Sequence, residues 1–349
     1  MKPKRTEKKN FFSKDRYAKW RLKAVNTLVV SCFTNLFRVY RMDSTHTAVE
    51  YLVGLLCCEK GHENMERMTE KIEDSDYKRY IHFLSVSNWS TLEVNNATLK
   101  ATDNLLREQK KNSGLPTGFV VDETSHLKKG SKSVAVARQY AGVAGKVDNC
   151  QVGVHTSLAN GKFCTLVGTE LFIPEAWIND KKRCDAAGVP KEEQKFATKP
   201  QLALKLIKQA VETGIEFDFI AGDGLYGHNA ELTRALDNLK LFYVLDVHKD
   251  ETVFLSEPTF SIPERKGNKG RIPTNLKPNI QPIQLQAYIK TLREKDFTTE
   301  NVRQTAKGWK VAKVHTVTIW HWDGKQEKAC KRTLVITVCR KNEILIEQW

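Results

Sequence analysis

Apolar residues in the first third of the chain recur at helical intervals. From Ser44 to about Leu106 they return every three or four positions, for example at Val49, Leu52 and Leu56, and this spacing puts them on one face of an α-helix. Polar and acidic stretches interrupt the pattern. The sequence therefore predicts a small N-terminal domain of several short helices.

The periodicity changes after a polar stretch at residues 110–118, which we interpret as a linker. Short β-branched, apolar runs follow, and Asn160-Gly161 between two of them is a strong hairpin signal. One helix is expected between Thr198, its N-cap, and Gly214, just past its end. A second helix is expected over 228–239, and strands are expected over 119–122, 134–140, 151–158, 162–172, 217–221 and 241–247.

This order, β-β-β-α-β-α-β, is that of a ribonuclease H-like core, a mixed sheet with flanking helices. We therefore predict an α/β fold with such a core over residues 115–248. Beyond it, a basic loop rich in Gly and Pro precedes strand-like runs at 309–322 and 333–339. Residues 249–349 are accordingly predicted to form a β-rich insertion.

The charge of the chain favours a polyanionic partner. Among 349 residues, 56 Lys and Arg face 41 Asp and Glu, which gives a net charge of +15 and a pI near 9.3. The mean hydropathy is −0.47 and no apolar run approaches the ~20 residues of a membrane span. The cysteines include no CxxC pair that would indicate a zinc site. We expect a cytoplasmic protein without membrane contact, associated with the nucleoid through DNA or RNA.

The N-terminal segment 2–23 concentrates basic residues and interleaves them with aromatic ones. Basic groups neutralise phosphates and aromatic rings stack on bases, so the segment suits a DNA-binding arm. A solvated basic arm explains it equally well. We group this arm with the predicted helices as a DNA-binding region over residues 1–110.

Two aspartates are the candidate catalytic and metal-binding residues. Asp122 ends the first predicted core strand and Asp223 follows a later one, and these strands lie side by side in the predicted topology. Two carboxylates held close together need a cation, and their hard oxygen ligands suit Mg²⁺ or Mn²⁺. Such a site activates a water or a 3′-hydroxyl for attack on a phosphodiester. A single aspartate at a strand end is more often a turn former or a helix cap.

The segments around both aspartates resemble insertion-sequence transposases of the IS4-like DDE superfamily. They are Val121–Gly130, Ser133–Tyr140, Asn149–Val154 and Ala221–Gly227. The resemblance spans roughly residues 40–340 and implies a ribonuclease H-like fold with a β insertion. It also implies terminal inverted repeats of double-stranded DNA as substrate, homo-oligomers on that DNA, and Asp122 and Asp223 as the first two members of an acidic triad.

The same resemblance implies DNA contacts from basic residues near Asp122 and in the loop of the insertion. They are Lys128, Lys129, Arg138, Arg265, Lys266, Lys269 and Arg271. Each of them is also compatible with an ordinary solvated surface charge.

The third acidic residue of that family is a glutamate on a helix after the insertion, within a Y-x₂-R-x₃-E-x₆-K type motif. Nothing like this motif follows Cys339. We therefore expect a chain that lacks the third acidic ligand and ends before that helix. Two outcomes stay open, a transposase and a DNA-binding regulatory fragment without catalysis.

A rival interpretation uses the glycines around Asp223. Gly222, Gly224 and Gly227 have the spacing of a dinucleotide-binding turn, and Asp246 follows about 20 residues later. Taken alone, this pattern predicts an NAD-binding enzyme. Against it, Asp223 would direct a carboxylate at the pyrophosphate, and the motif does not open the first β-α-β unit of a domain.

Overall fold

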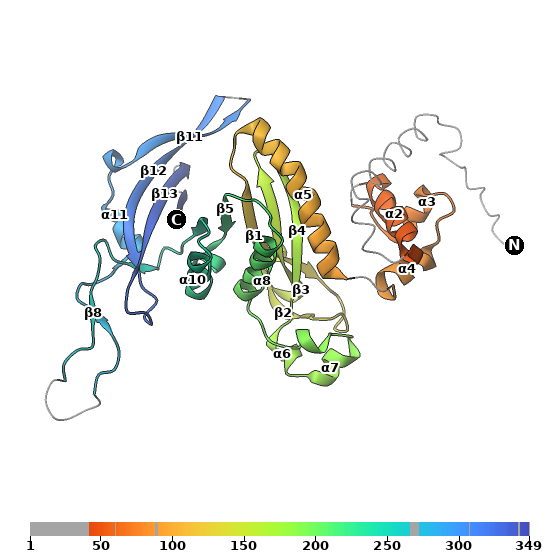
Figure 1. Cartoon of the computed structure of the whole chain (residues 1–349), viewed down its shortest axis with the longest axis horizontal. Coiled ribbons are helices and arrows are strands. Elements are labelled where there is room, and N and C mark those ends of the chain that lie inside the picture. Colours follow the sequence, from red (N-terminus) through yellow and green to blue (C-terminus); the bar gives the residue numbers. More distant parts are fainter. Residues whose placement is uncertain are drawn as a thin grey trace. The chain divides into compact units, whose positions relative to one another are not determined.

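The computed structural model describes residues 42–59, 61–87, 90–265, 272–306, 308–340 and 343–348. The chain divides into two compact units, residues 1–105 and 106–349 (Figure 1). The predicted basic arm at residues 2–23 lies outside the described residues. The predicted three-part domain division stays a prediction.

The first unit is helical, as predicted. Its helices are α2 (Met42–Cys57), α3 (Met65–Lys71), α4 (Tyr77–Ser85) and the first part of α5 (Thr91–Ser113). Asn64 caps α3 and Asp76 caps α4, because each side chain accepts a hydrogen bond from an amide of the first turn. Ala48, Val53 and Phe83 form a buried cluster of this unit. Short capped helices thus pack on a small apolar core.

The predicted linker begins later than expected. Helix α5 continues through Lys110 and Lys111 to Ser113, and Gly114 follows with a φ of +66°. Basic side chains are good helix formers and are favourable in a last turn, where they face the free carbonyls. The polar composition that indicated a linker therefore belongs to the end of a helix.

Ten strands of the second unit form one sheet within the described part of the chain. Its order is β11-β12-β13-β14-β6-β5-β1-β3-β2, and β4 also pairs with β3. The strands are β1 (Gly118–Leu127), β2 (Ala137–Ala141), β3 (Lys146–Asn160), β4 (Phe163–Phe172), β5 (Phe219–Gly222), β6 (Tyr243–Asp246), β11 (Thr298–Thr305), β12 (Gly308–His321), β13 (Cys330–Arg340) and β14 (Glu343–Gln348).

The sheet is mixed. Strand β5 runs parallel to β1 and β6, whereas β1 and β3 are antiparallel. Four strands, β1 to β4, precede the long helix that begins after Thr198, and all four overlap predicted strand ranges, although the predicted order β-β-β-α-β-α-β counted only three. Strands β2 and β4 pair with different halves of β3. The predicted mixed α/β class is confirmed, and the sheet with its helices is consistent with a ribonuclease H-like fold.

The predicted hairpin between β3 and β4 is confirmed. Asn160 pairs with Phe163 across the turn, and Gly161 has a φ of +60°, which glycine adopts without strain. The buried Asn160 amide donates to the Leu115 carbonyl at 2.8 Å and accepts from the Ser113 hydroxyl at 2.8 Å. Asn160 therefore links the hairpin to the segment that leads into β1.

Helix α8 (Lys199–Glu212) has the predicted ends. The Thr198 side chain forms a capping box with Gln201, and Gly214 follows the helix with a φ of +75°. The helix packs on β3 and β4, where Leu206 lies close to Gly168. The remaining helices before β7 are α6 (Glu175–Ile178), α7 (Lys181–Ala186), α9 (Gly224–Gly227) and α10 (Ala230–Asn238), and the 3₁₀ turns are η1 (Gly142–Ala144), η2 (Lys191–Glu193) and η3 (Glu294–Asp296).

The C-terminal part is β-rich, as predicted, but its strands join the core sheet. Strands β11 to β14 form an antiparallel series, and β14 pairs with β6 so that Glu347 lies opposite Asp246 in register. Between β6 and β11 the elements are β7 (Thr252–Val253), β8 (Phe260–Ser261), β9 (Lys277–Pro278), β10 (Ile283–Gln284) and α11 (Leu285–Thr291). Within the described part of the chain, none of the helices has the length and apolar character needed to cross a membrane.

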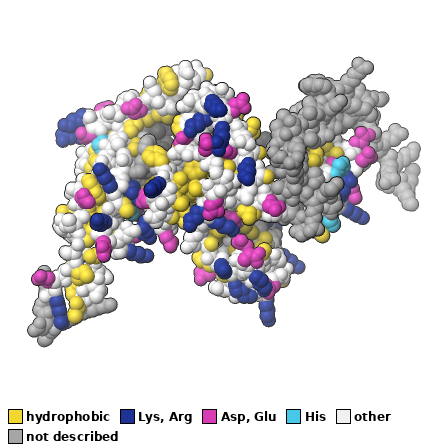
Figure 2. All heavy atoms as spheres, viewed as in Figure 1, with side chains coloured by type: hydrophobic (Ala, Val, Ile, Leu, Met, Phe, Trp, Pro, Cys, Tyr) yellow, Lys and Arg dark blue, Asp and Glu magenta, His cyan; other side chains and the backbone are white. Residues whose placement is uncertain are grey.

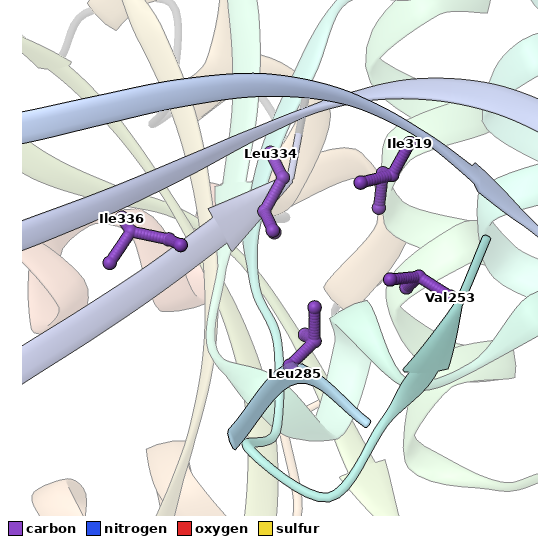
Figure 3. Close-up of a cluster of buried hydrophobic side chains, with 5 residues drawn as sticks. All are labelled: Val253, Leu285, Ile319, Leu334 and Ile336. Carbon is purple, nitrogen blue, oxygen red and sulfur yellow. The ribbon is translucent and has the colours of Figure 1, made fainter. Parts of the chain in front are cut away.

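A separate apolar cluster holds this C-terminal part together. It consists of Val253, Leu285, Ile319, Leu334 and Ile336, which come from β7, α11, β12 and β13 (Figure 3). Burying a large aliphatic side chain stabilises a fold by about 1.5–3 kcal/mol. The cluster therefore anchors the short helix α11 and strand β7 to the long hairpin of β12 and β13.

Candidate active site

Asp122 and Asp223 occupy neighbouring positions at one edge of the parallel strand pair. Val121 on β1 pairs with Gly222 on β5, and each aspartate is the next residue of its strand. Strand β1 was predicted to end at Asp122, but it continues to Leu127. It continues because β3 pairs with it on the other side as far as Cys150, whereas β5 stops at Gly222.

The Asp223 carboxylate caps the one-turn helix α9. Its Oδ1 accepts a hydrogen bond from the Leu225 amide at 3.0 Å. Partial burial raises the pKa of Asp223, and the nearby charges of Glu123 and Asp122 raise it further, although the Leu225 hydrogen bond acts in the opposite direction. The ionised form of Asp223 is therefore less favourable, relative to the protonated form, than that of an ordinary aspartate.

Asp122 lies on the solvent-exposed face of β1. Its Oδ1 accepts from the Glu123 amide at 2.8 Å, and its cross-strand neighbour on β3 is His155. The Nδ1 atom of His155 lies 2.9 Å from the Thr169 hydroxyl, and burial, together with His126, lowers the pKa of His155. Burial therefore disfavours the charged form of the imidazole beside Asp122, although the charge of Asp122 acts in the opposite direction.

Sequence reasoning missed Asp246 as a member of this acidic edge. Gly222 pairs with Leu245 on β6, so Asp246 stands one strand beyond Asp223 in the same row. Burial and the charge of Asp223 raise the pKa of Asp246, and His248 partly offsets them. The available signal was the position of Asp246 at a strand end, which the sequence interpretation connected only with a dinucleotide site.

Glu123 was also missed, and it points away from Asp122. Successive residues of a strand alternate between the two faces of a sheet, and the cross-strand neighbour of Glu123 is the buried Val154. Its Oε1 lies 2.9 Å from the Lys199 ammonium nitrogen, and its Oε2 accepts from the Tyr226 hydroxyl at 3.0 Å. Nothing in the spacing along the chain indicated these partners.

Close packing explains two of the three glycines with dinucleotide-type spacing, Gly222 and Gly227. A Cβ atom at Gly227 would lie 2.0 Å from the Asp246 carbonyl oxygen, and one at Gly222 would lie 3.1 Å from the Leu245 side chain. The N-terminus of α9 is capped by Asp223, at the place where a dinucleotide site would need to accept a pyrophosphate. The NAD interpretation stays a prediction without further support.

No ion pair within the described part of the chain includes Asp122, Asp223 or Asp246. The described residues also contain no group of three or more His, Cys, Asp and Glu side chains arranged to hold a metal ion. The acidic edge therefore offers two adjoining carboxylates, Asp122 and Asp223, which accept backbone hydrogen bonds but have no ion-pair partner within the described residues.

Three of the predicted DNA-contact residues lie together at the far end of β1. Lys128 continues the strand by donating its amide hydrogen to the Asn149 carbonyl at 2.9 Å, and Arg138 on β2 pairs with the same Asn149. Lys128, Lys129 and Arg138 are all exposed. Their roles stay predictions.

The other predicted contacts belong to the loop between β8 and β9. Arg265 is exposed, whereas Lys266, Lys269 and Arg271 lie outside the described residues. On the face drawn in Figure 2, Lys and Arg side chains are spread over the surface and alternate with Asp and Glu. Among the side chains coloured in that view, the basic ones therefore form no single block on that face.

Comparison with known proteins identifies the relatives of this arrangement. A family model described as DDE superfamily endonuclease matches residues 29–308. A probable transposase for insertion sequence element IS701 from Microchaete diplosiphon is 32% identical over 173 residues. That alignment covers 49% of this chain and 41% of the relative, so the chain spans about two fifths of that protein's length.

Proposed function

We propose, from the premise that the chain belongs to the DDE superfamily endonuclease family, that it is an insertion-sequence transposase. In this proposal residues 115–248 form a ribonuclease H-like core that cuts phosphodiester bonds at terminal inverted repeats and transfers the freed strand. Asp122 and Asp223 bind the divalent cation, and the protein works as an oligomer on double-stranded DNA.

One observation carries the proposal. Val121 on β1 and Gly222 on β5 are paired in register. Asp122 and Asp223, which are distant in sequence, are the next residues of the two strands and therefore neighbour each other. Neither aspartate belongs to an ion pair within the described residues, and each adds to the repulsion at this edge. Such a pair is costly in a protein unless a cation joins it.

The two carboxylates fit Mg²⁺ or Mn²⁺. Mg²⁺ is commonly bound through one or two carboxylates, while waters and substrate phosphates fill its other positions. Burial, followed by the charges of Glu123 and Asp122, raises the pKa of Asp223, and a bound cation would stabilise its ionised form. A bound divalent ion supplies Lewis-acid activation of the attacking oxygen and stabilises the leaving oxygen.

The protein's own contribution is to orient the ligands and the DNA. Asp223 is fixed by its cap to the Leu225 amide, and Asp122 is fixed within a continuous strand. Asp122 lies on the same exposed strand face as Thr124, His126 and the following Lys128. That row leaves the sheet open to a large polyanionic substrate on the side where Asp122 points.

The same row suggests how DNA approaches the site. Lys128 is the sixth residue after Asp122. A strand rises about 3.4 Å per residue, so the basic positions lie roughly 20 Å from the acidic ones. Lys128 and Arg138 flank Asn149 on neighbouring strands. They would hold a backbone about six base pairs from the scissile phosphate, since duplex DNA also rises about 3.4 Å per base pair.

A DNA-binding regulator is the second candidate. It is favoured by the finding that the described residues contain no group of three or more His, Cys, Asp and Glu side chains arranged to hold a metal ion. Both candidates use the same basic residues, so only phosphodiester cleavage separates them.

Nicking of supercoiled DNA that carries the element's ends tests the proposal. With Mg²⁺ the wild type should nick this DNA, and Asp122→Asn should lower the rate at least about a thousandfold because one ligand is lost. Affinity for DNA should stay nearly unchanged, because phosphate attraction comes mainly from Lys and Arg.

Asp148→Asn is the matched control, since Asp148 belongs to β3 of the same sheet and pairs with Lys146 at 3.3 Å. This variant should nick like the wild type. Undiminished nicking by Asp122→Asn would refute the role of Asp122, and a gel shift by the wild type without nicking would favour the regulator.

A further inference from the structure

The Glu123 carboxylate connects three elements of the second unit. Oε1 lies 2.9 Å from the ammonium nitrogen of Lys199, the first residue of α8, and Oε2 accepts from the Tyr226 hydroxyl of α9 at 3.0 Å. Each oxygen thus has its own partner on a different helix. Hydrogen bonds with an ionised partner are roughly twice as strong as neutral ones, so the Glu123 carboxylate stabilises the contact of β1 with both helices.

The three side chains are shielded from solvent to different degrees. The Glu123 and Lys199 side chains are 23% and 21% exposed, and Tyr226 is fully buried. Solvent therefore screens the pair less than it screens a surface ion pair. Glu123 is directed to the face of the sheet opposite Asp122, as its pairing with Val154 requires.

Helix α9 is held at two consecutive residues. Tyr226 is tied to β1 through Glu123, and Gly227 packs so closely on β6 that a Cβ atom would lie 2.0 Å from the Asp246 carbonyl oxygen. Asp223 caps this helix through the Leu225 amide. A four-residue helix has little stability of its own, so these attachments fix where the Asp223 carboxylate lies.

We propose that Glu123, Lys199 and Tyr226 form a positioning clamp that holds α9, and with it the Asp223 carboxylate, beside Asp122 for divalent cation binding. The clamp rests on the proposed function, because it has a role only if the two aspartates bind the cation. Its three residues are positioning residues in this proposal and not ligands of the cation. Outer partners of metal ligands typically contribute 10–100-fold to metal affinity.

Removal of the Tyr226 hydroxyl is the most specific test. Tyr226→Phe keeps the buried ring and deletes only the donor to Glu123. The full chain is titrated with Mn²⁺ without DNA, and the free ion is followed by electron paramagnetic resonance. We expect the Mn²⁺ dissociation constant to rise about tenfold, since α9 loses one of its two attachments.

Tyr243→Phe is the matched control. Tyr243 lies on β6 and is 4% exposed, and its hydroxyl donates to Asp237 of α10 at 3.2 Å. Deleting this hydroxyl should lower the melting temperature to a similar extent but leave the Mn²⁺ affinity unchanged. A purely structural role of Tyr226 would make both variants behave alike, and that result would overturn the clamp.

The lysine gives an independent test with a conservative rescue. Lys199→Met should weaken Mn²⁺ binding, and Lys199→Arg should restore most of it, because arginine keeps the charge-assisted contact with Glu123. Lys205→Met is the control in the same helix, since Lys205 pairs at 3.0 Å with Glu170 of β4 and not with Glu123. Equal Mn²⁺ affinities for Lys199→Met and Lys205→Met would contradict the clamp.

Failure of the clamp is distinguishable from failure of the proposed function. If Asp223→Asn loses Mn²⁺ binding while Tyr226→Phe and Lys199→Met bind like the wild type, the clamp is wrong and the metal site stands. If the wild type itself binds no Mn²⁺, both the clamp and the metal-dependent function are overturned.

Discussion

Carboxylates are compensated differently in two regions of the second unit. In the region where α10 meets β12 and β13, three carboxylates have basic partners within the protein. Glu251 lies 2.5 Å from Nδ1 of His228 and 3.1 Å from Nε2 of His321. Arg234 pairs with Asp323, and Arg332 pairs with Asp237.

The acidic edge of β1, β5 and β6 is the other region. There Asp122, Asp223 and Asp246 belong to no ion pair within the described residues. Burial, and after it the repulsion from neighbouring carboxylates, raises the pKa of Asp223 and of Asp246. The difference separates carboxylates that hold the fold together from carboxylates that repel one another. Only the second kind gains from a cation supplied from outside.

The largest expected effect concerns a paired carboxylate. Arg234→Met leaves Asp323, whose side chain is 10% exposed, without its cation. Breaking a largely buried pair from one side is strongly destabilising, so we expect a loss of about 2–3 kcal/mol in the free energy of unfolding. Urea denaturation measures it. Arg67→Met is the control, because the exposed pair of Arg67 and Glu70 should contribute below about 1 kcal/mol.

Equal destabilisation by the two arginine variants would break the comparison. It would mean that Asp323 is no more dependent on its partner than a surface carboxylate is.

The next effect is the acid sensitivity of Glu251. Burial tends to raise the pKa of Glu251, but hydrogen bonds and charges from His321 and His228 outweigh it, so the pKa is below the ordinary 4.5. A depressed carboxylate pKa stabilises the fold above the unfolded value, and this contribution disappears as the pH falls through the folded value. Stability should therefore decline below pH ~4.5.

Glu251→Gln identifies the group responsible for this decline. The variant should lose about 1–2 kcal/mol near neutral pH, because two hydrogen bonds to a charged group are weakened. Its unfolding free energy should then fall less steeply with acid than that of the wild type. An unchanged slope would remove Glu251 from the account of acid sensitivity.

Removal of a carboxylate charge at the acidic edge should raise the free energy of unfolding, whereas removal of the Glu251 charge lowers it. Because the pKa of Asp223 is raised above 3.8, its ionised form at neutral pH costs stability. Asp223→Asn removes the charge and keeps the helix cap, since asparagine caps as well as aspartate does. In metal-free buffer the variant should be more stable by about 0.5–1 kcal/mol. A less stable variant would show that the charge is already compensated within the protein.

The smallest effect concerns DNA. Arg138→Gln should weaken binding only modestly and equally for all sequences, and the slope of log affinity against log salt should decrease by about one. Filter binding at several salt concentrations measures it. Arg183→Gln is a suitable control, because Arg183 lies over the ring of Trp177 at 3.7 Å and has a packing role. An identical salt slope for Arg138→Gln would exclude Arg138 from the interface.

Much of the fold could be predicted from local signals. The hairpin at Asn160-Gly161 and the ends of α8 depend on residues close together in sequence, and the structure confirms both. Strands β11 and β14 were not predicted, because their residues lack a clear apolar alternation and they are paired by distant strands. Pairing partners of this kind are not encoded in a local pattern.

In the candidate site, too, some residues could be located from the sequence and others could not. The neighbouring positions of Asp122 and Asp223 followed from strand order, and the register of β1 and β5 agrees with it. Asp246 and Glu123 were not recognised, because their relevance depends on the register of β6 and on side chains from α8 and α9. The roles of all these residues stay predictions.

Thermal unfolding of the full chain with increasing Mg²⁺ is the most direct test of the two-aspartate site. A cation that binds only the folded state should raise its stability by about 2.7 kcal/mol at a hundred times the dissociation constant. We predict such a rise for the wild type and none for Asp122→Asn. The same rise in Asp122→Asn, or no rise in the wild type, would contradict the assignment of Asp122 and Asp223 as the cation ligands.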